Sequence, residues 1–251
     1  MKGLTFELSG KTAFFKKPDV NSFAYFTYNN IHKIALLGML GAIIGLKGYN
    51  QREISGGEDK LNYPEFYEKL KDLKVSIVPI SQKGYFGKKL QVFNNSVGYA
   101  SKERGGNLIV REQWLENPKW EIFILNDGSI ENEIFNKLSA NIVNGKCEFV
   151  PYLGKNDHMA NIKKSKEIEI KEVKDIEFIS SLFPIDKVKL DDDETYDDNN
   201  PYLFVESLPI RLNKEYHFYE FLKLGFTNLE IDEIYDLDDV YRCEDKVLAF
   251  I

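Results

Sequence analysis

The stretch IHKIALLGMLGAIIGLKGY, residues 31–49, holds 13 uncharged residues, Ile34–Leu46, between two lysines. A bilayer span needs about 20 apolar residues, so this segment predicts one buried helix of a soluble domain. Gly38, Gly41 and Gly45, spaced at i, i+3 and i+7, fall on one face of that helix. Each glycine costs about 1 kcal/mol of helix stability relative to alanine. Three on one face therefore predict a close approach by another backbone.

Two basic side chains begin this helix, His32 and Lys33. The N-terminus of a helix is electropositive, so a cation there is unfavourable unless an anion docks at the same point. A core helix with an incidental lysine is an equally open interpretation.

Charge divides the chain into two unlike parts. The formal net charge is -7, but residues 1–111 contain 17 Lys and Arg against 9 Asp and Glu, whereas residues 112–251 contain 16 against 31. A basic front half indicates a polyanionic partner, and an acidic remainder is typical of docking on basic protein neighbours. Simple solvation of both surfaces is the alternative.

Cysteines and histidines are few and scattered. Cys147 and Cys243 give no disulfide framework, and His32, His158 and His217 are too far apart in sequence for a CxxC or HxxxH pair. We therefore expect free thiols, no structural or catalytic metal and no cofactor.

The N-terminal segment MKGLTFELSGK has no apolar signal-peptide core. We expect a cytoplasmic protein without a membrane partner.

The order of predicted elements in the first part of the chain is strand, helix, two strands, helix, strand. That order predicts an α+β, ferredoxin-like domain, the fold of RNA-recognition modules, over residues 1–158. A long hairpin projects from it as a thumb at about 82–112. The expected elements are a strand at 4–15, helices at 31–49, 63–73 and 129–142, and strands at 75–80, 120–125 and 148–153.

Short strand patterns follow and predict a smaller β-rich domain over 159–251. They lie at 167–173, 202–210, 215–221 and 240–251. The acidic run DDDETYDDNNP, residues 191–201, is expected to be a solvated loop.

Motifs of the common enzyme classes are missing. The sequence has no GxxxxGK[ST] phosphate loop, no GxGxxG and no GxSxG elbow. GGED at 56–59 resembles a nucleotide-cyclase signature but is only four residues long. A metal-free ribonuclease stays open, since Tyr28, His32 and Lys33 supply the residue types for acid and base.

Cations alternate with aromatic residues throughout the front half, which favours nucleic acid. Cations neutralise phosphates, and rings stack on bases for about 1–3 kcal/mol each. Ser9, Gly10 and Lys11 follow the first strand and offer backbone N–H groups and a cation. The interleaved residues are Phe14, Phe15, Lys16, Lys17, Phe23, Tyr25, Phe26, Tyr28, Lys83, Tyr85, Phe86, Lys88, Lys89, Tyr99, Lys102, Arg104 and Arg111.

Five segments resemble one known family, the CRISPR-associated protein family five, over most of the chain. The glycine helix and the PYLG segment are the most specific. The segments are FELSGKTAFFKKPDVNS (6–22), YNNIHKIALLGMLGAIIGLKGY (28–49), EQWLENPKWEIFIL (112–125), PYLGKNDHMANI (151–162) and DVYRCEDKVLAFI (239–251).

This resemblance implies a RAMP-superfamily subunit of a type I Cascade complex, of subtype I-B, acting in antiviral defence. It implies a non-catalytic protein that caps the 5′ handle of the crRNA and contacts the Cascade backbone and large subunits, meeting target DNA only indirectly. Carried onto this chain, it implies RNA contacts by Ser9, Gly10, Lys11, Lys16, Lys17, Tyr25, Tyr28, His32, Lys33, Phe86, Lys88, Lys89, Arg104 and Arg111, with His158 and Asn161 beside them.

Two alternatives remain. One branch of the family processes precursor crRNA with Tyr, His and Lys, so a metal-independent endoribonuclease using Tyr28, His32 and Lys33 is the second hypothesis. A protein-only adaptor without an RNA function is the third.

Overall fold

The computed structural model describes residues 1–19, 23–51, 63–195, 197 and 200–251. The GGED residues, 56–59, lie outside this described part. The helices are α1 (Lys33–Ile44), α2 (Glu65–Leu70), α3 (Asn132–Val143) and the 3-10 turns Tyr49–Gln51, Gln82–Gly84, Ala100–Lys102 and Ile185–Lys187. The strands are β1 (Lys2–Ser9), β2 (Thr12–Ala13), β3 (Val75–Pro79), β4 (Lys88–Asn94), β5 (Ile109–Glu116), β6 (Lys119–Asn126), β7 (Asn161–Glu169), β8 (Lys171–Glu172), β9 (Phe183–Pro184), β10 (Val188–Thr195), β11 (Leu203–Leu212), β12 (Tyr219–Thr227), β13 (Leu229–Ile234), β14 (Val240–Cys243) and β15 (Lys246–Ala249).

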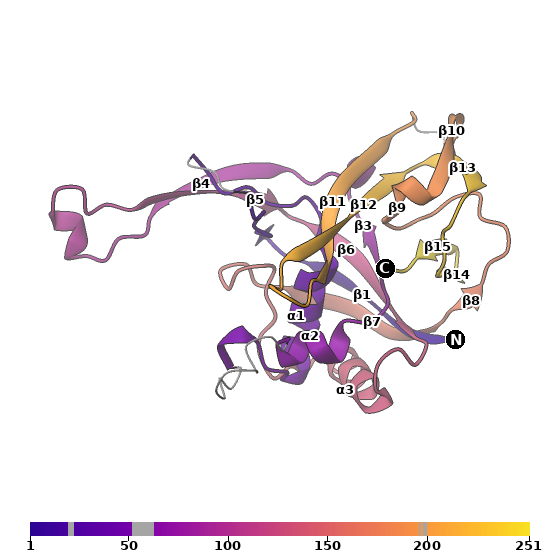
Figure 1. The fold of residues 1–251 in the computed structure, drawn as a ribbon, viewed down its shortest axis with the longest axis horizontal. Coiled ribbons are helices and arrows are strands. Elements are labelled where there is room, and N and C mark those ends of the chain that lie inside the picture. The colour runs from indigo at the N-terminus through magenta and orange to yellow at the C-terminus, as the bar shows by residue number, and fades with distance from the viewer. Residues whose placement is uncertain (20–22, 52–62, 196, 198–199) are drawn as a thin grey trace.

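A four-stranded antiparallel sheet, in the order β3-β6-β1-β7, forms the centre of the first part of the chain. Leu4 of β1 lies opposite Ile124 of β6, and both are fully buried. The helices α1, α2 and α3 lie together on one side in Figure 1. The C-terminal hairpin β14–β15 packs on Phe123 and Leu125, so apolar side chains cover both faces of β6.

The fourth strand corrects the sequence-based prediction. It is β7, at 161–169, and not the segment 148–153. The backbone N–H groups of Glu148 and Phe149 donate instead to the carbonyls of Ile43 and Ala42. Those carbonyls belong to the end of α1, where they lack partners within the helix. The segment 148–153 therefore completes a helix terminus.

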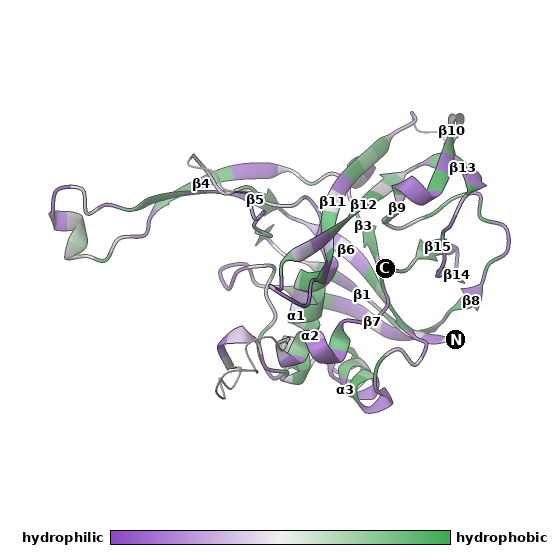
Figure 2. Cartoon of the chain, in the orientation of Figure 1, coloured by the Kyte–Doolittle hydropathy of each residue, from purple (hydrophilic) through white to green (hydrophobic). Residues whose placement is uncertain are grey.

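Helix α1 is apolar on nearly every side, as expected of a buried helix, and Figure 2 shows its hydrophobic colouring. Gly38 and Gly41 face Phe66 of α2, and a Cβ on Gly41 would lie 2.6 Å from the Cβ of Phe66. Gly45 ends the helix with φ +83° in the left-handed region that glycine tolerates. The predicted close approach is thus confirmed for Gly41, whereas Gly38 has ordinary contact with the Phe66 ring and Gly45 is the C-cap.

The hairpin predicted at 82–112 is confirmed in outline. Strands β4 and β5 pair antiparallel and project from the rest of the molecule as a long ribbon (Figure 1). Its inner end joins β2, which pairs with β5.

The later part of the chain is rich in short strands, as predicted. The acidic run at 191–201 begins as the end of β10, which pairs with β13, so its first part is strand and not loop. One core cluster joins Leu208 and Leu224 to Leu36 and Leu40 of α1. The domain boundary at 158 stays a prediction.

Candidate nucleic-acid interface

One face of the β4–β5 ribbon combines exposed apolar side chains with cations. Lys88, Leu90 and Val92 alternate along β4 and share this face, and Arg111 lies directly opposite Val92. Leu90 and Val92 are 51% and 49% exposed. The guanidinium carbon of Arg111 lies 5.3 Å from the ring centroid of Phe23. This face therefore offers both hydrophobic area and positive charge.

The opposite face carries a second set of cation–ring pairs. Lys89 lies across from Trp114, with its Nζ 5.7 Å from the ring centroid. Lys155 places its Nζ 5.1 Å from the centroid of Phe93 and forms an ion pair with Glu112 at 3.2 Å. Lys88 and Arg111 therefore lie on one face of the ribbon, and Lys89 lies on the other. Sequence reasoning missed Trp114 and Lys155, although the PYLGK motif contains the lysine.

Three lysines lie in two different settings at the base of the ribbon. The Nζ of Lys16 lies 3.8 Å above the ring of Tyr25, and both residues are exposed. Lys17 forms an ion pair with Glu206 at 3.7 Å. Burial lowers the pKa of Lys88, and the negative charge of Glu206 opposes that shift. Glu206 therefore offsets part of the positive charge here.

The turn after β1 presents one free side chain. Lys11 is exposed, whereas Gly10 is buried and a Cβ on it would lie 2.5 Å from Leu153. The carbonyl of Lys11 accepts from the N–H of Asn117 at 2.9 Å. Ser9 is half-buried at the end of β1. The backbone N–H of Gly10, expected to be available to a ligand, donates instead to the carbonyl of Pro118 at 3.2 Å.

Three predicted contact residues lie in the core. Tyr28, His32 and Phe86 are 2%, 4% and 4% exposed. Phe86 packs edge-on against Trp120, with centroids 5.1 Å apart. His32 is the N-cap of α1, and its Nδ1 accepts from the N–H of Ala35 at 3.2 Å. Burial lowers the pKa of His32 to about 3. These rings therefore offer no stacking surface, and His32 is neutral at pH 7.

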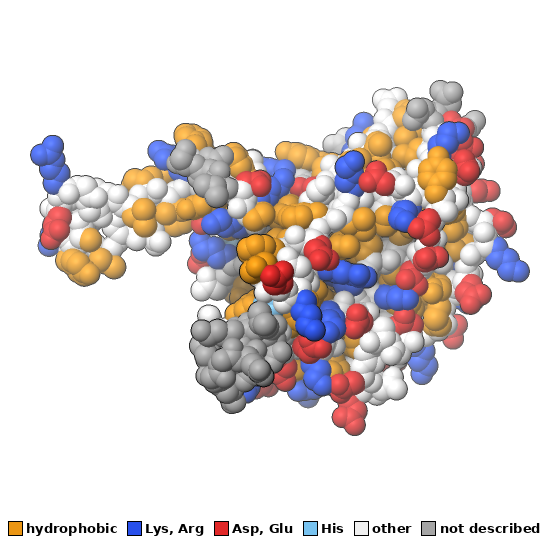
Figure 3. Space-filling model, viewed as in Figure 1, with side chains coloured by type: hydrophobic (Ala, Val, Ile, Leu, Met, Phe, Trp, Pro, Cys, Tyr) orange, Lys and Arg blue, Asp and Glu red, His pale blue; other side chains and the backbone are white. Residues whose placement is uncertain are grey.

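Two further predicted cations lie apart from the ribbon base. Arg104 is exposed in the turn between β4 and β5, at the far end of the ribbon. Lys33 is buried and lines a separate cavity, together with Arg211. Figure 3 shows Lys and Arg side chains at both ends of the ribbon, with hydrophobic side chains between them.

The PYLG segment lies beside the ribbon base. His158 is 1% exposed, its Nδ1 lies 2.7 Å from the hydroxyl of Thr12, and its ring is edge-on to Trp114 at 4.6 Å. Burial lowers its pKa. Asn161 is exposed as the first residue of β7. His158 therefore supports the ribbon from inside, and Asn161 is accessible.

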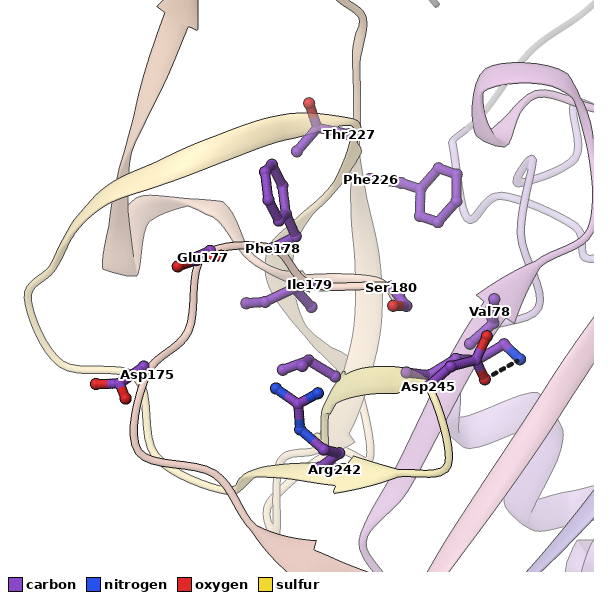
Figure 4. Close-up of a pocket in the computed structure, with 12 residues that line it drawn as sticks. Val78, Asp175, Glu177, Phe178, Ile179, Ser180, Phe226, Thr227, Arg242 and Asp245 are labelled. Carbon is purple, nitrogen blue, oxygen red and sulfur yellow. Dashed lines mark ion pairs between the residues drawn. The ribbon is translucent and has the colours of Figure 1, made fainter. Parts of the chain in front are cut away.

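A cavity of about 520 Å³ lies between the segment 175–180 and the β14–β15 hairpin. Figure 4 shows Arg242 rising from β14 toward this segment, with Asp175, Glu177 and Asp245 at its rim. Charges of both signs line it, and none of the predicted RNA contacts does. This cavity favours no single class of ligand.

Within the described ranges, no three His, Cys, Asp or Glu side chains gather in a way that suits a metal ion. None of the described helices is long and apolar enough to pass through a bilayer.

Comparison with protein-family models and with curated proteins gives no match. Two solved structures are similar over nearly the whole chain. One is a CRISPR protein from Archaeoglobus fulgidus, with a TM-score of 0.51, 13% identity and coverage of 99% of this chain and 98% of that one. The other belongs to a CRISPR RNA-guided surveillance complex, with a TM-score of 0.52, 12% identity and coverage of 92% and 91%. The chain therefore shares its fold with proteins of CRISPR systems.

Proposed function

We propose that this chain is a non-catalytic RNA-binding subunit of a type I CRISPR Cascade complex, of the family-five branch and subtype I-B. It caps the 5′ handle of the crRNA and contacts the backbone and large subunits. The ribbon base carries the proposal, since the exposed pair of Lys16 and Tyr25 lies there beside an extended hairpin, and Lys17 and Lys88 add positive charge near Glu206.

The fold supports this proposal at a coarser level. The sheet order β3-β6-β1-β7, with its strand–helix–strand–strand–helix–strand connectivity, agrees with the ferredoxin-like domain that we propose. RNA-recognition modules and the RAMP superfamily share that arrangement. One structural neighbour comes from an RNA-guided complex, which agrees with crRNA and other Cas subunits as partners.

The cations and the apolar side chains of the ribbon suggest a division of labour. Lys16, Tyr25 and Arg111 hold phosphates and stack on bases near the ribbon base. The exposed Leu90 and Val92 contact a neighbouring subunit, since apolar side chains on an isolated ribbon lose water only against a partner.

The burial of His32 and Tyr28 supports a non-catalytic role. A general base must reach the proton that it abstracts, and the Nδ1 of His32 is already occupied by Ala35. No specific observation favours the endoribonuclease.

The binding test uses the purified chain and a fluorescent single-stranded RNA with the handle sequence. We expect the affinity to fall as salt rises, with a slope near -0.7 per phosphate contact. The double variant Lys16→Ala/Arg111→Ala should bind at least about fivefold more weakly, with a shallower slope. Lys223→Ala, which removes an exposed lysine on β12, is the matched control. A flat salt response, also with Cascade partners present, would favour the protein-only adaptor.

The cleavage test incubates the chain with repeat RNA in EDTA. We expect intact RNA. Defined products that disappear in His32→Ala would overturn the non-catalytic role in favour of the endoribonuclease.

A further inference from the structure

A cavity of about 410 Å³ lies where α1 begins, walled by β11 and the C-terminal segment. Lys33, Lys74, Arg211, Asp239 and Phe250 are among its lining residues. No residue of β4 or β5 lines it, so it is distinct from the ribbon base.

Lys33 occupies an unfavourable electrostatic position in this cavity. It is the first residue of α1 and only 7% exposed. The positive end of a helix disfavours a cation, and burial of an unpaired charge is costly. Within the described part of the chain, its ammonium has neither a hydrogen bond nor an ion pair. Burial lowers the pKa of Lys33 to about 8, and the charges of Arg211 and Lys74 act in the same direction, whereas those of Asp72 and Asp239 oppose the shift. An anion would relieve each of these effects.

The other lysines of the cavity already have carboxylate partners. Lys74 binds Asp239 at 2.7 Å and Asp127 at 3.1 Å. Three more acids line the cavity. Asp236 pairs with Lys187, whereas Asp72 and Asp238 are exposed to water.

Lys71 is paired as well, with Glu68 at 2.7 Å. Arg211 resembles Lys33, since its guanidinium makes no hydrogen bond or ion pair with any described residue. The cavity thus holds two cations with which none of its described acids forms an ion pair, although Asp72 and Asp239 act on Lys33 from a greater distance.

We propose that Lys33 and Arg211 hold a phosphate-class anion at the N-terminus of α1. Arginine binds phosphate oxygens with two parallel hydrogen bonds, and the helix N-terminus favours negative charge. An inorganic phosphate or a phosphate of an RNA chain supplies the same chemistry. The site does not depend on the RNA-binding role proposed for the ribbon.

The test follows the side-chain NMR signal of Lys33 in the full chain, with ¹³C-labelled lysine, during titration with inorganic phosphate in a constant chloride background. We expect the signal to shift with saturation and the pKa of Lys33 to rise, because a bound anion favours the charged ammonium. Arg211→Gln should raise the phosphate Kd at least about fivefold, as loss of a charge-assisted pair predicts. Lys223→Gln should leave the Kd unchanged.

Arg211→Gln also keeps the test independent of folding, because Arg211 is exposed and Lys33 remains available as the probe. A Lys33 signal that does not move with phosphate, or that moves equally in Arg211→Gln, would refute the site.

A second arm identifies the source of the anion. If single-stranded RNA shifts the Lys33 signal and phosphate competes with it, the site takes a phosphate of the nucleic acid. If only inorganic phosphate shifts the signal, the site takes the free anion. The affinity of the ribbon for RNA is measured separately, with Lys16→Ala/Arg111→Ala. Loss of the phosphate response at Lys33 and loss of RNA binding at the ribbon are therefore distinguishable results.

Discussion

Both carboxylate oxygens of Glu206 accept the backbone N–H of Asn29, at 2.9 and 3.0 Å. One of them also accepts the N–H of Asn30 at 3.2 Å. A strand from the later part of the chain thereby fixes the loop that leads into α1. The Oδ1 of Asn29 in turn accepts from the N–H of Phe86, which ties the ribbon base to the same loop.

Glu206→Ala should destabilise the protein by about 2–3 kcal/mol, because two backbone N–H groups lose their acceptor in a largely buried setting. Urea denaturation followed by circular dichroism measures the change. Glu220→Ala removes an exposed carboxylate from β12 and should change the free energy of unfolding by less than about 0.5 kcal/mol. Equal stability of the two variants would show that Glu206 does not hold the loop.

Gly41→Ala should destabilise the chain although alanine favours helix by about 1 kcal/mol. Its Cβ would lie 2.6 Å from the Cβ of Phe66, so α2 has to move. Gly38→Ala is the matched control, since its nearest neighbour is a ring carbon of Phe66 at 3.8 Å. We expect Gly38→Ala to be neutral or stabilising in thermal unfolding. The opposite order of stability would contradict the packing of α1 on α2.

The pH dependence of the free energy of unfolding should reveal the lowered pKa of Lys33. Burial lowers its pKa to about 8 from the usual 10.5, so between these values the unfolded chain binds more protons. Stability contributed by this group therefore rises with pH across the window from 8 to 10.5, by about 3 kcal/mol. Tyrosines and Cys243 titrate at similar pH, so the measured quantity is the difference between the wild type and Lys33→Met. A difference that is constant across the window would show that Lys33 titrates normally.

His32→Ala should cost about 2–4 kcal/mol of stability, because the variant loses the N-cap and the ring contacts with Tyr28 and Tyr219. His32→Asn supplies an amide oxygen as a cap in place of the Nδ1 and should recover roughly 1 kcal/mol. Chemical denaturation of both variants separates capping from packing. If both lose the same stability, the cap contributes nothing.

Much of the first part of the fold follows from hydrophobic periodicity. The strands β3 and β6 and the helices α1 and α3 lie within a few residues of the segments predicted for them. Most of their apolar residues face one large core and the others face a smaller one, so the local pattern and the tertiary environment agree.

The fourth strand could not be recognised in this way. β7, NIKKSKEIE, is an edge strand whose side chains are mostly exposed, so it lacks an alternating apolar pattern. EFVPYL at 148–153 is a short apolar run, which resembles a buried strand, but it serves to complete the end of α1. An edge strand is held by hydrogen bonds to the backbone of its neighbour, here β1. Those bonds do not depend on the side chains of β7, so its sequence gives no sign of the pairing.

The candidate site was predictable in composition but not in orientation. Cations and rings do pair, as at Lys16 and Tyr25. Which aromatic residues are internal depends on contacts between distant segments, such as Phe86 with Trp120. A single sequence does not reveal those contacts, so Tyr28 and Phe86 were expected at the surface.

The position of β7 has a practical consequence for truncation. A fragment that stops at residue 158 would leave one side of β1 without its hydrogen-bonding neighbour, since β1 pairs with β7 from Lys2 to Ser9. An unprotected strand of that length is a template for self-association. Expression trials of the front half should therefore extend past Glu169 to yield a well-behaved species.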